Sequence, residues 1–176
     1  MKKTISFICI AALFALSGCA AVVQKPANTA AIHTTGHIKQ VALLITAKPD
    51  IKSSSDWLTF CAEWRSAFNA AASARKIHSV YLEKAPDTLP SGTVLVRVFV
   101  NDYRYMTPGE RFGFGILAGN AYIEAKADFV EFPGAQKIGS EKLSTTSSAW
   151  QGVFSAVTDK QVRAISDDIL TELTGA

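Results

Sequence analysis

Alternation of apolar and polar side chains is sharpest over residues 94–132 and predicts two long strands there. From Val94 to Tyr105 one set of alternate positions starts with four valines and the other includes Leu95, Phe99, Tyr103 and Tyr105, and polar residues follow in both sets from Asn101 onward. From Ala121 to Phe132 the first eight residues place Ala and Ile on one face and Tyr, Glu, Lys and Asp on the other. Because successive side chains of a strand point to opposite faces, the second strand has one face in the core and one in water.

Shorter runs predict three further strands. Ile38–Thr46 and Ile77–Glu83 are rich in branched apolar residues, and the first of them ends before a turn at Lys48-Pro49-Asp50. Phe132-Pro133-Gly134-Ala135 is a second turn. The strand that follows it, Lys137–Ser147, therefore completes a long antiparallel hairpin with the strand before the turn.

A helix is predicted from Trp57 to about Lys76, with Ser55 or Asp56 as its cap. Apolar residues recur there every three or four positions, at Trp57, Cys61, Trp64, Phe68 and Ala71. An aromatic stripe with this spacing is typical of a helix face that packs on a core.

A second helix is predicted from Thr158 to Leu173, where Thr158 and Gln161 have the spacing of a capping box. The element order is therefore β-α-β-β-β-β-α. We expect an α+β fold: a mixed, mainly antiparallel five-stranded sheet, built from a β-α-β unit and then a long hairpin, with two helices packed on one face.

The first 18 residues have the pattern of an export signal. Lys2 and Lys3 precede the uncharged apolar run Ile5–Leu16. This run is well short of the roughly 20 residues that a helix needs to cross a bilayer, so we expect a cleaved signal peptide rather than a membrane span.

Leu16-Ser17-Gly18-Cys19 closes this run and resembles the bacterial lipobox at every position. The resemblance implies that signal peptidase recognises Leu16, Ser17 and Gly18, and that Cys19 becomes the first residue and carries S-diacylglycerol and an N-palmitoyl chain. At about 0.8 kcal/mol per buried CH₂, three acyl chains form an effectively permanent anchor. Ala20 follows instead of an aspartate, which favours the outer membrane in many Gram-negative bacteria. An ordinary secretory signal with a chance cysteine is the alternative.

The predicted organisation is a signal peptide at 1–18, a lipidated N-terminus and flexible tether at 19–37, and a single periplasmic α+β domain at 38–176. Residues 20–36 show neither helical nor strand periodicity, and fully extended they span at most about 60 Å. The whole sequence has 18 basic and 15 acidic residues. Removal of Lys2 and Lys3 with the signal peptide leaves 16 basic residues against 15 acidic ones, and this nearly balanced charge does not favour nucleic acid as a partner. Cys61 is the one cysteine left after Cys9 is removed and Cys19 is acylated, and we expect it to pack in the core.

Pro108–Gly119 (PGERFGFGILAG) combines glycines that free the backbone with apolar side chains. Three interpretations stay open: a bulged connection between strands, an exposed apolar loop that binds a partner protein or another copy, and a ligand pocket rimmed by Arg111, Tyr103 and Tyr105. The residues we expect at a partner contact are Arg104, Arg111, Phe112, Phe114, Ile116 and Leu117. The glycine spacing misses the dinucleotide fingerprint, so no cofactor is predicted.

Catalytic and metal-ligating groups are sparse in this sequence. His78 is the one histidine of the predicted domain core, and no nucleophile or metal-site motif occurs near it. His33 and His37 stand four apart, but Thr34, Thr35 and Gly36 between them argue against the helix that a metal site would require. We therefore expect no metal site and no enzymatic activity.

The chain from about Ile38 to Leu173 resembles a family of small bacterial outer-membrane lipoproteins whose domain has no known function. The resemblance rests on Val98-Phe99-Val100-Asn101-Asp102-Tyr103, on Gly109-Glu110-Arg111 with Gly113-Phe114-Gly115, on Ala121-Tyr122-Ile123-Glu124-Ala125, and on the final helix. More distantly, the layout is similar to the TolB amino-terminal domain, to lipoprotein activators of penicillin-binding proteins, and to the curli secretion lipoprotein. These similarities imply a non-enzymatic adaptor.

The sequence thus predicts a lipid-anchored outer-membrane lipoprotein that faces the periplasm and binds an envelope protein. An envelope hydrolase and a subunit of a self-assembling envelope complex are the alternatives. The identity of the partner and the oligomeric state cannot be predicted from the sequence.

Overall fold

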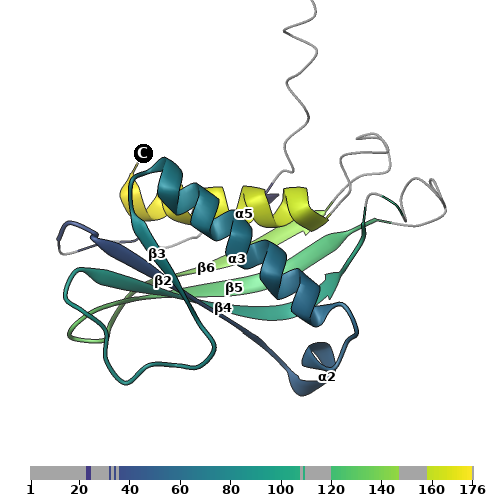
Figure 1. Cartoon of the computed structure of the whole chain (residues 1–176), viewed down its shortest axis with the longest axis horizontal. Helices are drawn as coiled ribbons and strands as arrows, with labels where there is room; N and C mark the ends of the chain where they lie inside the picture. Colours follow the sequence, from purple (N-terminus) through teal and green to yellow (C-terminus); the bar gives the residue numbers. More distant parts are fainter. Residues whose placement is uncertain are drawn as a thin grey trace, which may run out of the picture.

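A computed structural model describes residues 23–24, 32, 34, 36–107, 109, 120–146 and 158–175. Its central feature is a six-stranded sheet with the order β1-β6-β5-β4-β2-β3. The α+β class predicted from the sequence is confirmed. Figure 1 shows the two long helices, α3 and α5, lying across the same face of this sheet.

The chain builds one side of the sheet from a parallel β-α-β unit. Strand β2 (Gln40–Ala47) leads through α2 (Pro49–Lys52) into α3 (Trp57–Ala74), and β3 (His78–Leu82) returns parallel to β2. Strand β4 (Thr93–Arg104) also pairs parallel with β2, on its other side. Since β2 has neighbours on both sides and lies under α3, most of its side chains are buried.

The other side of the sheet is antiparallel. Strand β5 (Tyr122–Glu131) pairs with β4 and with β6 (Gln136–Thr146), which forms the predicted hairpin. On β5 the predicted alternation is confirmed: Ile123, Ala125 and Ala127 are buried, whereas Glu124 is exposed. Helix α5 (Thr158–Thr174) follows β6 and covers the buried face.

The main core lies between the helices and the sheet. Its largest fully buried side chains include Phe60, Trp64 and Phe68 from α3 and Phe129 from β5. They confirm that the aromatic stripe of the first predicted helix is a core face. A second, smaller apolar cluster lies on the opposite face of β2 and β4, where Leu89 packs against it.

The predicted numbers of strands and helices were wrong. Val23–Gln24, in the segment predicted as a tether, pairs with β6 as a sixth strand, β1. The predicted turn after β2 is a single helical turn, α2, which starts at Pro49, where the missing N–H needs no partner. Elements this short carry no periodic pattern, so the sequence gives no signal for them.

Among the described residues, no helix is both long and apolar enough to cross a membrane.

Candidate binding surface

Most residues predicted at the anchor and at the partner contact lie outside the described residues: Leu16, Ser17, Gly18, Cys19, Arg111, Phe112, Phe114, Ile116 and Leu117. Their roles stay predictions. Arg104 is described and is exposed at the end of β4, beside Tyr122 of β5. The described residues at the end of β4 therefore show the part of the domain from which the predicted contact segment, Pro108–Gly119, continues.

Tyr103 and Tyr105 at the end of β4 are turned toward α3. The Tyr103 ring stacks on Phe60 with the ring centroids 4.3 Å apart, and its hydroxyl donates to Asp56 Oδ1 at 2.5 Å. The Tyr105 hydroxyl donates to Glu63 Oε1 at 2.6 Å. Both tyrosines therefore fix the strand end onto the helix.

Asp56 is the N-cap residue of α3, but its side chain makes no capping hydrogen bond. Its carboxylate accepts instead from Tyr103 and from the Ser54 hydroxyl. Burial, together with the hydrogen bond to Asp56, raises the pKa of Tyr103 to about 12, so the phenol stays protonated and donates throughout the physiological range.

The start of α5 is joined to the same end of the sheet. The Met106 N–H donates to the Thr158 hydroxyl at 2.8 Å, and the Thr158 N–H donates to the Met106 carbonyl at 3.2 Å. Gln161 Nε2 donates to the carbonyl of Ala121 at 2.8 Å. Both residues of the predicted capping box thus hold α5 onto β4 and β5.

A groove lies between α3 and the edge strand β3, and we call it the α3–β3 groove. It consists of two adjacent depressions of about 350 and 340 Å³ that share Ala62, Arg65 and Tyr81. The first is also lined by Leu43, Ser66, Phe68, Asn69, Ser79 and Val80, and the second by Ile45, Lys52, Trp57, Leu58, Cys61 and Glu83. Its floor is therefore apolar and its rim polar.

One stripe of α3 forms the helical wall of this groove. Leu58, Ala62, Arg65 and Asn69 recur at helical spacing beside the core stripe. Leu58 is 80% exposed, the largest exposure among the bulky apolar side chains of the described residues. The guanidinium of Arg65 lies 5.7 Å from the centroid of the Tyr81 ring, across the groove.

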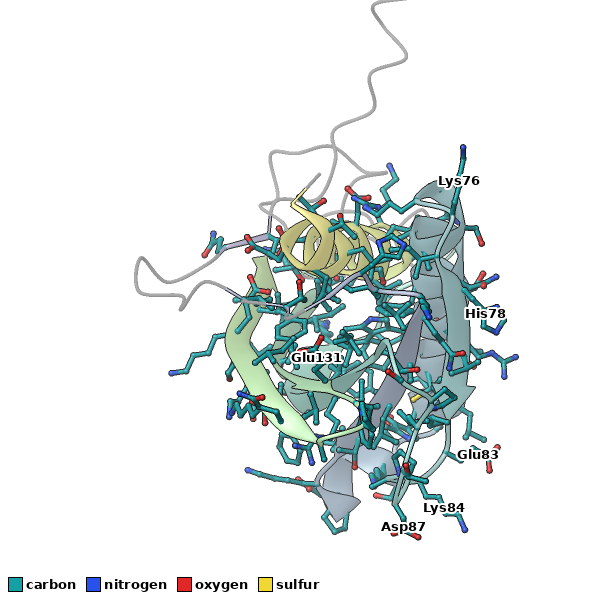
Figure 2. All side chains as sticks on the ribbon, turned by 90° about the vertical axis from the view of Figure 1, so that its left-hand side faces the viewer. Lys76, His78, Glu83, Lys84, Asp87 and Glu131 are labelled. Atoms are coloured by element: carbon teal, nitrogen blue, oxygen red, sulfur yellow. The ribbon has the colours of Figure 1, made fainter. Side chains whose placement is uncertain are left out.

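The opposite wall is β3, which pairs with β2 on one side and has no strand on its other side among the described residues. An edge strand presents backbone N–H and C=O groups to an added strand. Figure 2 shows Lys76, His78, Glu83 and Lys84 following one another along this side of the domain. Cations thus flank both ends of β3.

Cys61 lies at the base of the groove. Burial raises the pKa of its thiol to about 11, against the opposing effects of the Lys52 charge and a hydrogen bond with Tyr81. Burial also raises the pKa of Tyr81, as do the neighbouring Cys61 and Glu83 side chains. Both groups are therefore neutral at physiological pH, as expected for a residue that packs rather than reacts.

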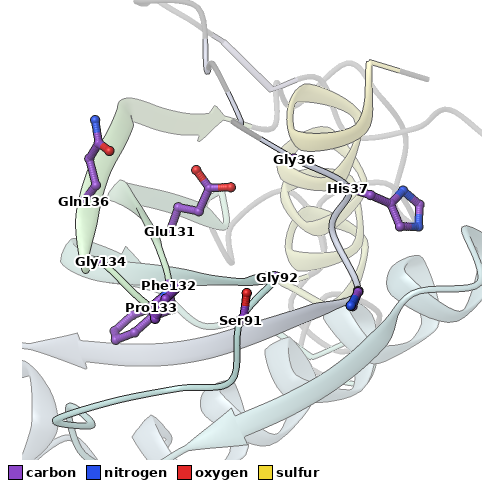
Figure 3. Close-up of a pocket in the computed structure, with 10 residues that line it drawn as sticks. Gly36, His37, Ser91, Gly92, Glu131, Phe132, Pro133, Gly134 and Gln136 are labelled. Atoms are coloured by element: carbon purple, nitrogen blue, oxygen red, sulfur yellow. The ribbon is translucent and has the colours of Figure 1, made fainter.

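Two other cavities lie at the end of the domain where β2 begins. One, of about 350 Å³, is lined by residues that include Gly36, His37, Glu131 and Gln136; Figure 3 shows His37 directed away from the other two polar side chains. The second, of about 660 Å³, contains Arg75, whose guanidinium already binds Asp167 at 2.8 Å. In neither cavity do free polar groups converge as they do in a typical ligand site.

Catalytic geometry is sparse over the part of the chain that is described. His78 is exposed at the start of β3, and the hydroxyl of the neighbouring Ser79 donates to Asn69 at 2.7 Å. No group of three or more His, Cys, Asp or Glu side chains among the described residues has the geometry of a metal site.

No family model and no curated protein matches this sequence. Solved structures with a similar arrangement include a Xanthomonas campestris protein assigned to the domain family DUF330, at 12% identity and a TM-score of 0.49, covering 89% of this chain and 95% of that one. PelC from Paraburkholderia phytofirmans, a dodecamer, has 12% identity and a TM-score of 0.48, covering 83% of this chain and 96% of that one.

One of these neighbours is assigned to a domain family of unknown function. Scores below 0.5 assign neither a family nor a function to this chain. The similarity to the TolB, penicillin-binding-protein activator and curli lipoproteins stays a prediction.

Sequence reasoning missed the α3–β3 groove. The signal that could have revealed it is Leu58, an apolar residue outside the core stripe, in line with Ala62 and Arg65. The second wall is more than ten residues further along the chain, and only the folded structure brings it alongside.

Proposed function

We propose that this protein is a lipid-anchored, non-enzymatic binding protein of the bacterial cell envelope. In this proposal Cys19 is acylated in the outer membrane, the domain faces the periplasm, and the α3–β3 groove holds an extended acidic segment of another envelope protein. The lipobox Leu16-Ser17-Gly18-Cys19 supports the anchoring, and the groove supports the binding role.

The observation that carries the binding role is the pairing of an edge strand with an apolar-floored groove. A peptide that adds to β3 gains backbone hydrogen bonds, and its alternate side chains enter the groove under α3. Side chains two residues apart in a strand point to the same face, which suits two adjacent depressions.

Charge favours an acidic segment. Two cations, Lys52 and Arg65, line the groove against one carboxylate, Glu83. Lys76 and Lys84 flank β3, and Asp87 follows Lys84 by three positions. Complementary charge raises the association rate and selects against basic partners. The same cations disfavour a second copy, because antiparallel pairing of β3 with itself about Val80 places Lys76 opposite Lys84.

The binding test uses a fluorescent six-residue peptide that alternates glutamate with valine or leucine, and the purified lipoprotein in detergent. We expect binding by fluorescence anisotropy and backbone amide shifts confined to β3 and α3. Arg65→Glu should weaken binding at least tenfold, since a charge-assisted contact contributes about 1.5 to 3 kcal/mol.

Arg163→Glu is the matched control, because Arg163 is an exposed arginine of α5. Its ion pair with Asp159 is weak, since the two charged atoms are 4.0 Å apart. A peptide with lysine in place of glutamate controls for non-specific adsorption. Equal binding of both peptides, or equal loss in both variants, would contradict the acidic-segment proposal.

The anchoring test is separate. Cys19→Ser should leave the precursor uncut or release the protein from membranes, as measured by fractionation and by mass spectrometry of the N-terminus. A variant that stays membrane-bound and fully processed would contradict acylation at this position.

A further inference from the structure

We infer that the N-terminal segment holds this domain directly against the lipid surface, with the end where β4 stops and α5 starts facing the membrane. This inference rests on the proposed acylation of Cys19. The sequence predicts a domain held away from the membrane on a long tether. In the inferred arrangement the domain instead lies at the membrane surface in a single orientation.

The first observation is that the expected tether is attached to the sheet. Val23 pairs with Thr145 and Gln24 with Ser144, and Val23 packs against the main core. Ile32 is attached as well: a Cβ built on Gly139 would lie 2.9 Å from Ile32 Cγ1, so the glycine makes room for this side chain. The free part of the segment therefore ends at Val23.

The second observation is the length of chain that remains. Cys19 precedes Val23 by four positions in the sequence. At no more than about 3.6 Å per residue, its Cα lies within roughly 14 Å of the Val23 Cα, compared with about 60 Å for an unattached segment. One polar headgroup layer is about 5 to 8 Å thick, so a span of roughly 14 Å keeps Val23 within about 10 Å of the headgroup surface and cannot hold the domain far from the bilayer.

The third observation gives the direction. Strand β6 runs toward Thr146, which pairs with Tyr122 at the start of β5, and Tyr122 pairs with Arg104 at the end of β4. Strand β1 is antiparallel to β6, so the chain before Val23 leaves the sheet at this same end. The Met106 to Thr158 contacts bring the start of α5 there too.

The opposite end is far from the membrane. Gly134, in the turn between β5 and β6, and Gly92, before β4, lie there. Strand β4 has 12 residues, which at about 3.3 Å each separate the two ends by roughly 40 Å. In this orientation the depression lined by Lys52 and Trp57 is the one nearer the membrane, because α3 begins beside Tyr103.

The test uses full-length acylated protein in phosphatidylethanolamine and phosphatidylglycerol vesicles that carry a headgroup nitroxide quencher. With Cys61→Ala removing the internal thiol, a bimane is placed at Asn120→Cys on the proposed membrane side, or at Gly134→Cys on the far side. Asn120 is exposed, and a Cβ at Gly134 meets nothing within 4 Å, so both labels are tolerated.

We expect the fluorescence at position 120 to fall at least threefold more than at position 134. Twelve glycine and serine residues inserted between Cys19 and Val23 should abolish this difference while vesicle flotation persists. Equal quenching at both positions in floating protein, or a difference that survives the insertion, would overturn the orientation alone. Protein that does not float would overturn the anchoring and the orientation together.

Discussion

Replacing Tyr103 with phenylalanine tests how the end of β4 is held on α3. The substitution keeps the ring that stacks on Phe60 and removes only the hydroxyl, which donates to Asp56 at 2.5 Å and lies 3.0 Å from the Ser54 hydroxyl. The carboxylate keeps its contact with Ser54. The expected loss is therefore that of one hydrogen bond to a carboxylate.

Such a bond contributes about 1.5 to 3 kcal/mol when buried. Because Tyr103 and Asp56 are only partly buried, the contribution is near the lower end of that range or below it, and we expect Tyr103→Phe to lower the free energy of unfolding by about 1 to 2 kcal/mol. For a domain of this size that is a fall in Tm of roughly 4 to 8 °C.

The measurement is urea unfolding of the purified protein, followed by tryptophan fluorescence, because Trp57 lies 6.1 Å from the Tyr103 ring. Tyr122→Phe is the matched control, since its hydroxyl also donates to an aspartate, Asp102 at 3.0 Å, but in an exposed position. The control should change stability by less than about 0.5 kcal/mol.

The pH dependence gives a second readout. Since the folded-state pKa of Tyr103 is about 12, above its ordinary value of 10.0, the stabilisation is complete below pH 10 and is lost as the pH rises toward 12. The difference between wild type and Tyr103→Phe should therefore shrink above pH 10. Equal losses in Tyr103→Phe and Tyr122→Phe at neutral pH would refute the argument that burial gives this contact its strength.

Three further outcomes are expected. Burial alone would raise the pKa of Asp128, but hydrogen bonds from Lys137, Ser140 and Lys126 outweigh it and lower the pKa to about 2. Asp128→Asn should therefore lose about 1 kcal/mol at pH 7, and the loss should shrink as the pH falls from about 5 toward 2, as measured by thermal unfolding across pH. With a pKa of about 11, Cys61 should alkylate with iodoacetamide at pH 8 about 100-fold more slowly than in unfolded protein, as measured by mass spectrometry. Thr158→Val leaves the buried Met106 N–H without its acceptor and should lower the free energy of unfolding by about 1 to 3 kcal/mol in urea, whereas an unchanged value would contradict the docking of α5.

The two proposals separate anchoring from recognition. Attachment depends on the thiol of Cys19 and on the short span to Val23, whereas recognition depends on Arg65 and the edge of β3. A variant of one should leave the other intact, because the two lie on different parts of the chain and contacts far apart contribute independently.

The sequence alone determined the five long strands and the two long helices to within a few residues. Elements that bury one face show a period in the sequence, two residues in β5 and three to four in α3, whereas β2, which is buried on both faces, is recognised as a short apolar run. The resemblance of Leu16-Ser17-Gly18-Cys19 to a lipobox is also visible in the sequence alone, because it depends on a linear string of residues and on no fold, and acylation there stays a prediction.

Only the tertiary structure decided where short or shared contacts form. Val23–Gln24 forms a strand because it pairs with the edge of β6. Two residues are too few to show an alternation of apolar and polar side chains in the sequence. The Asp56 side chain makes no capping hydrogen bond at the start of α3 and accepts one from Tyr103, 47 positions away in the chain. The α3–β3 groove likewise depends on Arg65 and Tyr81 meeting across a gap. Such contacts depend on how segments distant in the sequence pack together. A local sequence pattern does not specify which distant segment will contact it.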